Sequence, residues 1–297
     1  MTAEHTDISW YRAVEGALGV RPLSHQPLSG GCVAPVYRVD LMNGSSAVAK
    51  LGGGAGTFGG LELEGEMLEF LARESALPVP EVYLKTENLL LMEFLAGGSP
   101  IGDKSQQHAA ELLAALHNIL GPDYGRLGFG FEYDTVIGGL RQPNPWTKSW
   151  VEFFRDQRLI YMARGAFEAG RLEFSLLQRV ERLGERLDDL IDEPLHPSLI
   201  HGDMWTGNVL VDGPRVSGFV DPAVCYADAE IELAFSTLFG TFGVSFFKRY
   251  NEIRPIADGF FDLRLDIYNL WHLLTHVRLF GGSYVGSVDR ILRRHGL

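Results

Sequence analysis

The side chains best suited to chemistry lie in the stretch from Leu199 to Val211 and just beyond it. Asp203 stands five residues before Asn208, and a further acid, Asp221, follows the next apolar run. Asn208 and Asp221 supply hard oxygens of the kind that Mg²⁺ prefers, and this ion keeps phosphate and water oxygens as its other ligands. We therefore expect Asn208 and Asp221 to hold Mg²⁺, and Asp203 to accept a proton from a substrate hydroxyl.

Two apolar runs, 209–211 and 216–220, separate Asn208 from Asp221. The turn residues Asp-Gly-Pro-Arg lie between them, so the runs are predicted to pair as an antiparallel hairpin. Pairing about this turn places residue 208 opposite residue 221, at the spacing of about 5 Å that opposed residues have. One cation could then touch both. On the motif alone, an ordinary turn followed by a strand end remains an alternative, because short motifs match by chance.

The N-terminal part of the chain alternates strand and turn signals after an amphipathic helix predicted over residues 8–18. Gly30-Gly31 and Asn43-Gly44 each separate two strands, and Asn-Gly is the strongest short hairpin signal. Glycines at the first turn let backbone N–H groups approach a phosphate without a Cβ in the way. A plain glycine turn is the alternative. Cys32, beside these glycines, is hypothesised to be redox-sensitive.

Lys50 ends the next strand, whose period of two puts Val48 on the same face. Val48 could cover the flat base of a nucleotide while Lys50 reaches the phosphates of that nucleotide. The alternative is that Lys50 is an ordinary solvated lysine at a strand edge. A helix predicted over residues 61–72 carries several glutamates. Glu66 is predicted to pair with Lys50 and hold it in place.

The glycine-rich segment 52–60 offers a competing interpretation. Gly54-x-Gly56-x-x-Gly59 fits the dinucleotide-binding pattern, with Glu81 about 20 residues later, and predicts a Rossmann enzyme. However, the preceding strand belongs to a hairpin, and no alternating βαβ units follow. The glycines more simply predict a linker.

Two short strands, 82–85 and 89–94, precede the run Ala96-Gly97-Gly98-Ser99-Pro100, which is the best domain boundary in the sequence. We divide the chain there into a strand-rich unit, 1–95, and a helix-rich unit, 96–297, which is an α+β organisation. The chain leaves its sheet at Glu93, Phe94 and Leu95, where exposed peptide groups could pair with an adenine edge. A plain linker has the same sequence requirements.

Helical patterns dominate the second unit, over 106–120, 150–169, 172–190, 230–238, 246–253 and 260–280. His272 and His276 stand one turn apart, but the sequence supplies no third ligand, so a polar helix face is a better interpretation than a metal pair. Trp205 lies beside the proposed base, where an indole could stack on a sugar-like substrate or pack in the core.

Composition limits the partners. The 297 residues are 46% hydrophobic, enough for a large core, and 26 basic against 38 acidic residues give a net charge of −12. This charge disfavours nucleic acid and anionic membranes. The two cysteines are too few for a disulfide framework or a zinc knuckle. The first residues lack signal-peptide features, so we expect a cytoplasmic protein, a monomer or weak dimer, acting on a small molecule.

In their order, the glycine turn, strand lysine, helix glutamate, His201-Gly202-Asp203, Asn208 and Asp221 resemble the protein-kinase-like fold. Gly202 and the run Asp221-Pro222-Ala223 are similar to the small-molecule kinases of the aminoglycoside and choline kinase group. More narrowly, the chain resembles the fructosamine/ketosamine 3-kinase family over nearly its whole length. The segments that carry this narrower resemblance are 29–32, 135–138, 142–146, 150–154, 199–211, 221–223, 238–240, 273–276 and 279–284.

The resemblance implies a bilobal fold, with a small antiparallel-sheet N-lobe that carries one main helix and a larger, mostly helical C-lobe. It also implies ATP and Mg²⁺ as cofactors and phosphorylation of the 3-hydroxyl of a ketosamine, the rearranged adduct of a sugar with an amine. In that family the 3-phosphate decomposes spontaneously and frees the amine, so the activity serves deglycation of small molecules or proteins.

Carried over residue by residue, the resemblance implies a role for each candidate. Asp203 is the proton acceptor, Asn208 and Asp221 hold Mg²⁺, and the nucleotide contacts are Gly30, Gly31, Val48, Lys50, Glu66, Glu93, Phe94 and Leu95. Trp205 and His276 are candidate substrate contacts. The sequence departs from the family at Ala34-Pro35, Met204 and Thr206, and Pro35 lacks a backbone N–H near the phosphate turn. The rivals are a kinase of the same fold acting on an aminoglycoside, choline or another sugar, and an ATP-binding module without catalysis.

Overall fold

The computed structural model describes residues 9–28, 34–52 and 58–297. The predictions for Gly30, Gly31 and Cys32 lie outside these ranges, as do most glycines of the dinucleotide-like pattern. Within the described part, no helix is both long and apolar enough to cross a membrane.

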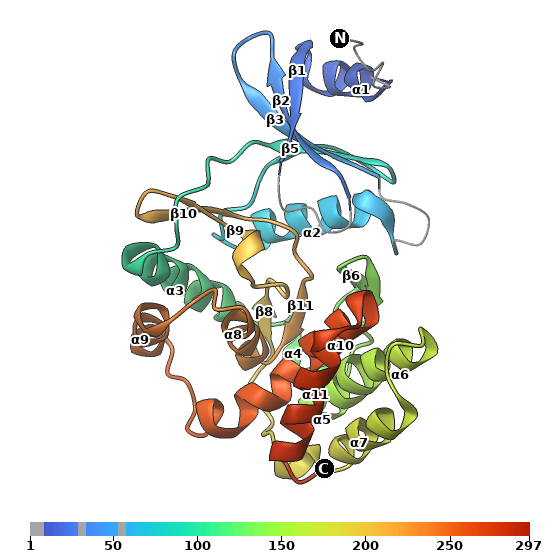
Figure 1. Cartoon of the computed structure of the whole chain (residues 1–297). Helices are drawn as coiled ribbons and strands as arrows, with labels where there is room; N and C mark the ends of the chain where they lie inside the picture. The colour runs from blue at the N-terminus through green and yellow to red at the C-terminus, as the bar shows by residue number, and fades with distance from the viewer. Residues whose placement is uncertain (1–8, 29–33, 53–57) are drawn as a thin grey trace.

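The N-lobe is built on one five-stranded sheet (Figure 1). All its strand pairs are antiparallel. A doubly wound parallel sheet is therefore absent from the described ranges, and the Rossmann alternative is wrong. In sheet order the strands are β1 (Pro22–Pro27), β2 (Val36–Leu41), β3 (Ser46–Leu51), β5 (Leu89–Glu93) and β4 (Val82–Thr86).

The hairpin predicted at Asn43-Gly44 is confirmed, because β2 and β3 pair directly about this turn. The N–H of Gly44 donates to the carbonyl of Leu41 at 2.9 Å, and the N–H of Leu41 donates to Ser45 O at 2.9 Å. Gly44 adopts φ +85°, the left-handed conformation that glycine tolerates without strain.

One helix covers each face of this sheet. On one face α1 (Ser9–Leu18) contributes Val14 to a small core with Ala47 and Ala49 of β3. On the other, α2 (Gly60–Glu74) packs Leu61 and Leu68 against a cluster that includes Val48. The predicted period of two in β3 is confirmed by these two cores, and Lys50 follows Val48 on the α2 face.

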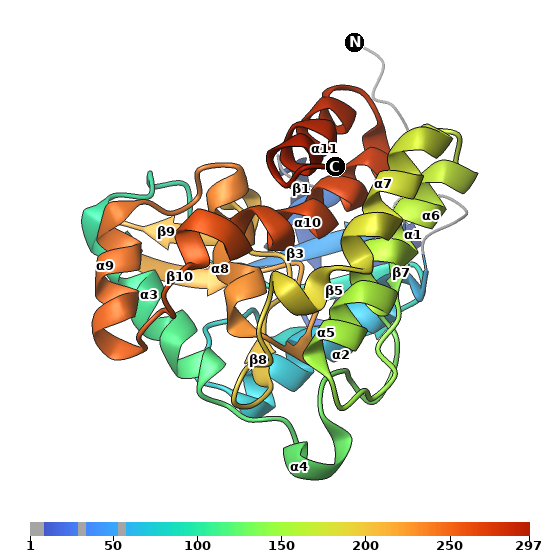
Figure 2. The same ribbon diagram turned by 90° about the horizontal axis from the view of Figure 1, so that it is seen from below.

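The C-lobe is mostly helical, and Figures 1 and 2 both show α3 beside α9. Its helices are α3 (Asp103–His117), α4 (Tyr124–Leu127), α5 (Trp150–Phe153), η1 (Phe154–Leu159), α6 (Ile160–Glu168), α7 (Phe174–Gly184), η2 (Leu187–Asp189), η3 (Thr206–Asn208), α8 (Ala229–Leu238), α9 (Val244–Ile253), η4 (Phe260–Arg264), α10 (Leu265–Phe280) and α11 (Ser283–Arg294). Three two-stranded sheets join them: β6 (Thr135–Ile137) with β7 (Leu140–Gln142), β8 (Ser198–Ile200) with β11 (Cys225–Ala227), and β9 (Val209–Asp212) with β10 (Arg215–Phe219). This α+β, two-lobed architecture is the one expected.

The helix predicted over 150–169 is not continuous, because a π-helical segment, η1, interrupts it. Arg158 on this segment is 1% exposed, and its guanidinium donates to Pro143 O at 2.7 Å and to Asn144 Oδ1 at 2.6 Å. The buried guanidinium therefore connects the π-helical segment η1 to the residues that precede α5. The helix α11 and the hairpin β6–β7 were not predicted.

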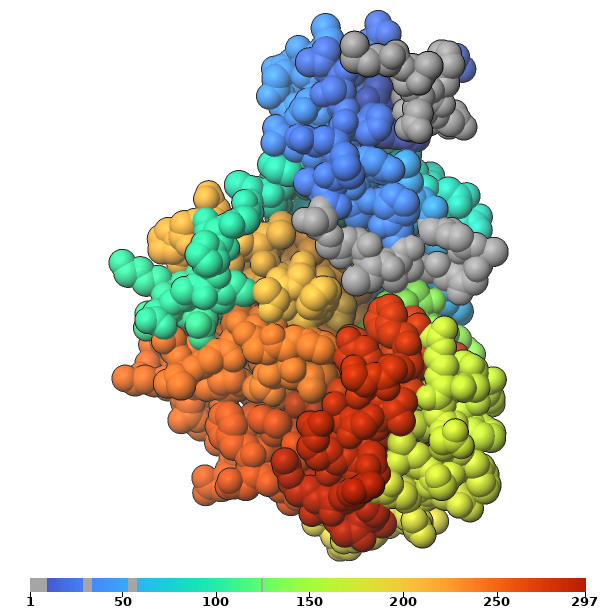
Figure 3. Space-filling view, in the orientation of Figure 1, coloured from blue at the N-terminus to red at the C-terminus, as the bar shows by residue number. Residues whose placement is uncertain are grey.

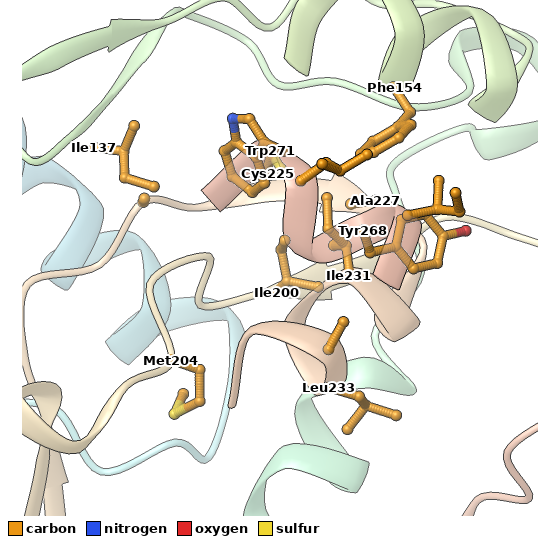
Figure 4. Packing of buried hydrophobic residues seen from close by; sticks show 14 of the residues in the cluster. Ile137, Phe154, Ile200, Met204, Cys225, Ala227, Ile231, Leu233, Tyr268 and Trp271 are labelled. Carbon is orange, nitrogen blue, oxygen red and sulfur yellow. The ribbon is translucent and has the colours of Figure 1, made fainter. Parts of the chain in front are cut away.

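The core of the C-lobe reaches up to the loop that carries Asp203 (Figure 4). Met204, one residue after Asp203, is fully buried in the same cluster as Ile200 and Trp271. Met67 and Leu71 of α2 belong to this cluster too. The helix α2 therefore packs against both lobes. The boundary at residues 95–96 itself stays a prediction.

Candidate active site

A close contact between two backbone segments forms the floor of the site. The strand β8 leads into His201-Gly202-Asp203, and β11, which pairs with β8, follows Asp221-Pro222-Ala223. The N–H of Ala223 donates to His201 O at 2.7 Å. Gly202 has φ +89°, and a Cβ built on it would lie 2.1 Å from Ala223 O. Only glycine fits there, because any side chain would collide with the backbone that precedes β11.

Asp203 and Asn208 are held together by a tight loop. The Nδ2 group of Asn208 donates to the carbonyl and to Oδ2 of Asp203, both at 2.8 Å. The loop closes through Trp205, whose N–H donates to Asp203 O at 3.1 Å and whose carbonyl accepts from the N–H of Asn208 at 2.9 Å. With its amide nitrogen engaged by Asp203, Asn208 keeps its Oδ1 as a candidate metal ligand.

The surroundings of Asp203 suit a proton acceptor. Burial raises the pKa of its carboxyl to about 7, the nearby negative charge of Asp221 acts in the same direction, and the hydrogen bond from Asn208 opposes them. A general base is most effective when its pKa lies near the working pH. Asp203 is therefore poised to exchange a proton near neutrality.

The hairpin predicted between Asn208 and Asp221 exists, but its register differs from the prediction by one residue. The pairing of β9 with β10 shifts between Val216 and Gly218, where a bulge at Ser217 lengthens one strand. The N–H of Val220 donates to Asn208 O at 3.1 Å, so residue 208 lies opposite residue 220, not 221. Asp221 comes immediately after that bond.

Asp221 has an unusual backbone conformation, with φ +55°. A non-glycine residue in this region bears a strain of about 1 kcal/mol or more. The turn brings its Oδ1 to 2.9 Å from Nζ of Lys50, which is 171 residues earlier in the chain. Burial alone would raise the pKa of Asp221, but the ammonium of Lys50 outweighs it and lowers the pKa below the ordinary value. Asp221 therefore stays ionised.

The partner predicted for Lys50 is wrong, because Glu64 and not Glu66 holds it. Nζ of Lys50 donates to the two carboxylate oxygens of Glu64, at 3.0 and 2.8 Å. On α2, Glu64 lies three residues after Leu61 and four before Leu68, so it shares the face that packs on the sheet. Glu66 is two residues further on, about 200° around the helix, and is half-buried away from Lys50.

Lys50 keeps its positive charge although it is buried with Glu64 and Asp221. Burial disfavours the ammonium, but Asp221 and Glu64 outweigh this effect and raise the pKa of Lys50. Burial raises the pKa of Glu64 to about 7, with Lys50 opposing it. Lys50 therefore presents a permanent positive charge beside Asp221.

Glu64 and Glu66 offer a matched pair of variants, because only Glu64 holds Lys50. Glu64→Gln removes the charge that holds Lys50, and charge-assisted hydrogen bonds contribute about 1.5–3 kcal/mol each, so we expect kcat/KM for ATP to fall about tenfold to a hundredfold. Glu66→Gln should change it by less than about twofold, since charges away from the site contribute little. Steady-state kinetics at varied ATP measure both variants. A larger loss for Glu66→Gln than for Glu64→Gln would contradict the assignment.

Glu232 is a positioning residue that the sequence did not reveal. Its carboxylate, on α8, accepts from the N–H of Gly202 at 2.6 Å and from the N–H of His201 at 3.3 Å. His117 Nε2 lies 2.8 Å from the same carboxylate, and His117 Nδ1 lies 2.7 Å from the hydroxyl of Tyr250. Burial lowers the pKa of His117. The neutral ring therefore donates through Nε2 to Glu232 and accepts through Nδ1 from Tyr250.

Tyr250, His117, Glu232 and the N–H of Gly202 form a buried chain that runs from α9 through α3 and α8 to the catalytic loop. Burial alone would raise the pKa of Glu232, but the hydrogen bond from His117 and the other donors lower it, so the residue stays ionised. In the sequence Glu232 looked like an ordinary acid in the first turn of a helix. The only signal was its place between two apolar residues, Ile231 and Leu233.

We expect Glu232→Ala to destabilise the protein by about 3 kcal/mol or more, because it leaves buried donors without an acceptor. Urea unfolding measures the change, with Glu62→Ala, an exposed acid on α2, as the matched control. Equal unfolding midpoints for the two variants would show that the buried chain contributes no stability.

The proposed nucleotide contacts lie around Lys50. Val48 is 7% exposed and lies in the core between sheet and α2. The N–H of Glu93 donates to Glu81 O at 2.8 Å, so an adenine contact at this residue would use its carbonyl, and the contact stays a prediction. The Phe94 ring lies 4.7 Å from the Arg38 guanidinium. The side chain of Leu95 crosses to β10, where a Cβ on Gly218 would lie 2.2 Å from it.

The two candidate substrate residues are brought to one surface. The Trp205 ring lies 6.4 Å from that of Phe239, and Phe239 lies 5.0 Å from His276. His272 points elsewhere, because it is 1% exposed and stacks on Phe235 at 3.6 Å. The metal-pair alternative for the two histidines is therefore not supported.

Across the described ranges, no group of three or more His, Cys, Asp or Glu side chains could hold a metal by itself. This does not conflict with Mg²⁺, which takes few protein ligands when phosphate is present. Asn208 Oδ1, which has no hydrogen-bond partner among the residues that the structure describes, and the ionised Asp221 flank the β9–β10 hairpin and are a donor set of the right chemistry.

The fold and this arrangement of Lys50, Asp203, Asn208 and Asp221 define a phosphotransferase of the protein-kinase-like class. A solved aminoglycoside phosphotransferase shares the fold at 17% identity, with a TM-score of 0.66 over 97% of this chain and 99% of its own. The family model described as fructosamine kinase matches residues 11–295. The chain belongs to the fructosamine kinase family.

Individual relatives agree with this assignment. A protein of Synechocystis sp., named a probable ketoamine kinase, is 33% identical over 90% of this chain and 88% of its own. The chloroplastic protein-ribulosamine 3-kinase of Oryza sativa subsp. japonica is 32% identical over 89% of this chain and 76% of its own. The crystal structure of a Thermobifida fusca protein, provisionally named a fructosamine-3-kinase, has a TM-score of 0.82 at 29% identity and covers 96% of this chain and 99% of its own.

Proposed function

We propose that this chain transfers the γ-phosphoryl group of ATP to the 3-hydroxyl of a ketosamine. The observation that carries the proposal is the convergence of Asp203, Asn208, Asp221 and Lys50 in a chain of the fructosamine kinase family. Relatives named for ketoamines and for ribulosamine support the substrate class.

Asp203 accepts the proton of the attacking hydroxyl. Its carboxylate is aligned by Asn208, and its pKa near neutrality suits both acceptance and release of that proton. Because phosphoryl transfer needs little covalent help from the protein, catalysis rests on this alignment and on charge neutralisation around the phosphates.

Lys50 supplies the fixed positive charge, and Glu64 keeps it extended toward the site. Asn208 and Asp221 would hold Mg²⁺, which neutralises phosphate charge when bound. Val48 and the segment from Glu93 to Leu95 would line the adenine site, with contacts from the carbonyl of Glu93 and the peptide of Leu95. Gly30 and Gly31 would approach the phosphates, and Trp205 and His276 the sugar.

Phosphorus NMR tests the reaction. With ATP, Mg²⁺ and a ribulosamine or fructosamine adduct, we expect a new phosphate ester at C3 and its subsequent decay with release of the amine. Asp203→Asn is the control for background hydrolysis. Ester formation on an aminoglycoside, on choline or on a plain sugar, with none on any ketosamine, would reject the substrate class.

The pH dependence tests the base. Asp203 acts only when ionised, so kcat/KM for the ketosamine is expected to fall as the pH decreases through about 7 and to level off above it. Glu64, whose pKa is also raised to about 7, would act in the same direction. The Glu64→Gln variant separates the effects of Asp203 and Glu64. If Asp203 is the base, the residual kcat/KM of this variant still falls as the pH decreases through about 7. A flat profile between pH 5 and pH 8 in this variant would contradict the role of Asp203.

A further inference from the structure

A row of aromatic side chains runs from the catalytic loop to the C-terminal helices. The Trp205 ring meets Phe239 at the end of α8, and Phe239 meets His276 on α10. Beyond it, the His276 ring lies 5.9 Å from Phe280 and 4.9 Å from Tyr284 of α11. We call these five residues the aromatic row.

The outer part of this row lies on the surface. Phe280 is 54% exposed and Phe239 is 38% exposed. In Figure 3 the red surface of the C-terminal helices borders the gold segment that includes the catalytic loop. Single exposed phenylalanines are ordinary, but these two belong to a continuous row of partly exposed rings that begins two residues from the base, which is typical of a binding surface.

The row is rich in electrons and has no positive charge among its members. His276 Nδ1 lies 2.7 Å from His272 O, and a carbonyl can only accept, so Nδ1 carries the hydrogen. Burial lowers the pKa of His276, which favours this neutral ring and leaves Nε2 as an acceptor. Two guanidiniums lie near this part of α10. That of Arg278 is 5.4 Å from the Tyr161 ring on α6, and that of Arg171 donates to the carbonyls of Arg278 and Leu279.

The chemistry of the proposed substrate matches this surface, and the inference rests on the proposed function. In a ketosamine the amine nitrogen is bonded to C1, two carbons from the C3 that bears the reacting hydroxyl. When that hydroxyl faces Asp203, the amine therefore lies near the catalytic loop, which also carries Trp205. A secondary alkyl amine carries a proton at neutral pH and is a cation. Cations are attracted to the faces of aromatic rings.

We propose that the aromatic row binds the ammonium group and the first carbons of its substituent. Trp205 and Phe239 lie nearest the sugar, and His276 Nε2 accepts an ammonium hydrogen. Phe280 and Tyr284 then select for a charged amine on the ketose. Since Phe280 lies on the surface, the rest of the substituent runs out to solvent.

The test compares two substrates with three variants. One substrate is an alkyl ketosamine, and the other is the matched ether, in which oxygen replaces the nitrogen. The variants are Phe280→Ala, Phe280→Leu, which keeps an apolar side chain without a ring, and Phe261→Ala. Phe261 is 57% exposed on η4 and packs on Phe247, so it is a matched control. ADP release gives KM and kcat, and an ether that is not turned over is measured by its inhibition constant.

For Phe280→Ala and Phe280→Leu we expect KM for the ketosamine to rise about threefold to tenfold, with kcat nearly unchanged. In both Phe280 variants the KM or inhibition constant of the ether should stay within about twofold of the wild-type value. Phe261→Ala should behave as wild type with both substrates. An equal loss with the ether, or an unchanged KM for the ketosamine, would overturn the inference. A wild-type enzyme that phosphorylates no ketosamine would overturn the proposed function itself, before any variant is measured.

Discussion

Asp203→Asn is expected to lower kcat by about a hundredfold to ten-thousandfold, the range that a general base contributes. The amide has nearly the same shape as the carboxyl and can still accept the hydrogen bond from Asn208. It cannot take the proton of the attacking hydroxyl, so the loss should appear in kcat while ATP binding is nearly unchanged.

The measurement pairs turnover with calorimetric ATP titration in the presence of Mg²⁺. Asp212→Asn is the matched control, because Asp212 is an exposed acid at the end of β9. Turnover of Asp203→Asn within a few-fold of the control would rule out Asp203 as the base. Loss of ATP binding together with turnover would assign it a different role.

Gly202→Ala is expected to abolish activity and to destabilise the fold. An alanine at φ +89° bears a backbone cost of about 1–2 kcal/mol. In addition, its Cβ would lie 2.1 Å from Ala223 O, so β8 and β11 must separate. Overpacking of this kind costs about 1–3 kcal/mol, and the separation moves Asp203 relative to Asp221.

Gly170→Ala isolates the backbone cost. Gly170 has φ +67°, and no atom lies within 4 Å of the position that a Cβ would take, so only the conformational penalty applies. Urea unfolding and turnover should show a moderate loss of stability with full activity for Gly170→Ala, and a larger loss with no activity for Gly202→Ala. Similar values for the two would mean that the collision with Ala223 relaxes without consequence.

Much of the architecture could be predicted because local patterns and tertiary packing agree. The Asn43-Gly44 turn needs a left-handed glycine, and the period of two in β3 places Val48 and Lys50 on one face; both are local properties of the sequence. Asp203 and Asn208 could be paired because the spacing of five residues closes a single loop.

The errors arise where tertiary geometry decides. The helix predicted over 61–72 carries four acids that are candidates for Lys50, and only the contact of Leu61 and Leu68 with the sheet selects Glu64. At Asp221 the difference begins at the turn: β9 and β10 pair Asp212 with Arg215, which alone would set residue 208 opposite residue 219, and the bulge at Ser217 moves its partner to residue 220. Glu232 was missed because its partners, His117 and the Gly202 backbone, are distant in sequence.

The position of α2 has a consequence for how the enzyme is controlled. In many kinases a mobile helix must swing inward before its acid meets the lysine. Here α2 packs Met67 and Leu71 into the core of the C-lobe and Leu68 against the sheet, and Lys50 donates to Glu64. An inward swing of α2 would have to break both contacts, so the packing of α2 disfavours this kind of control.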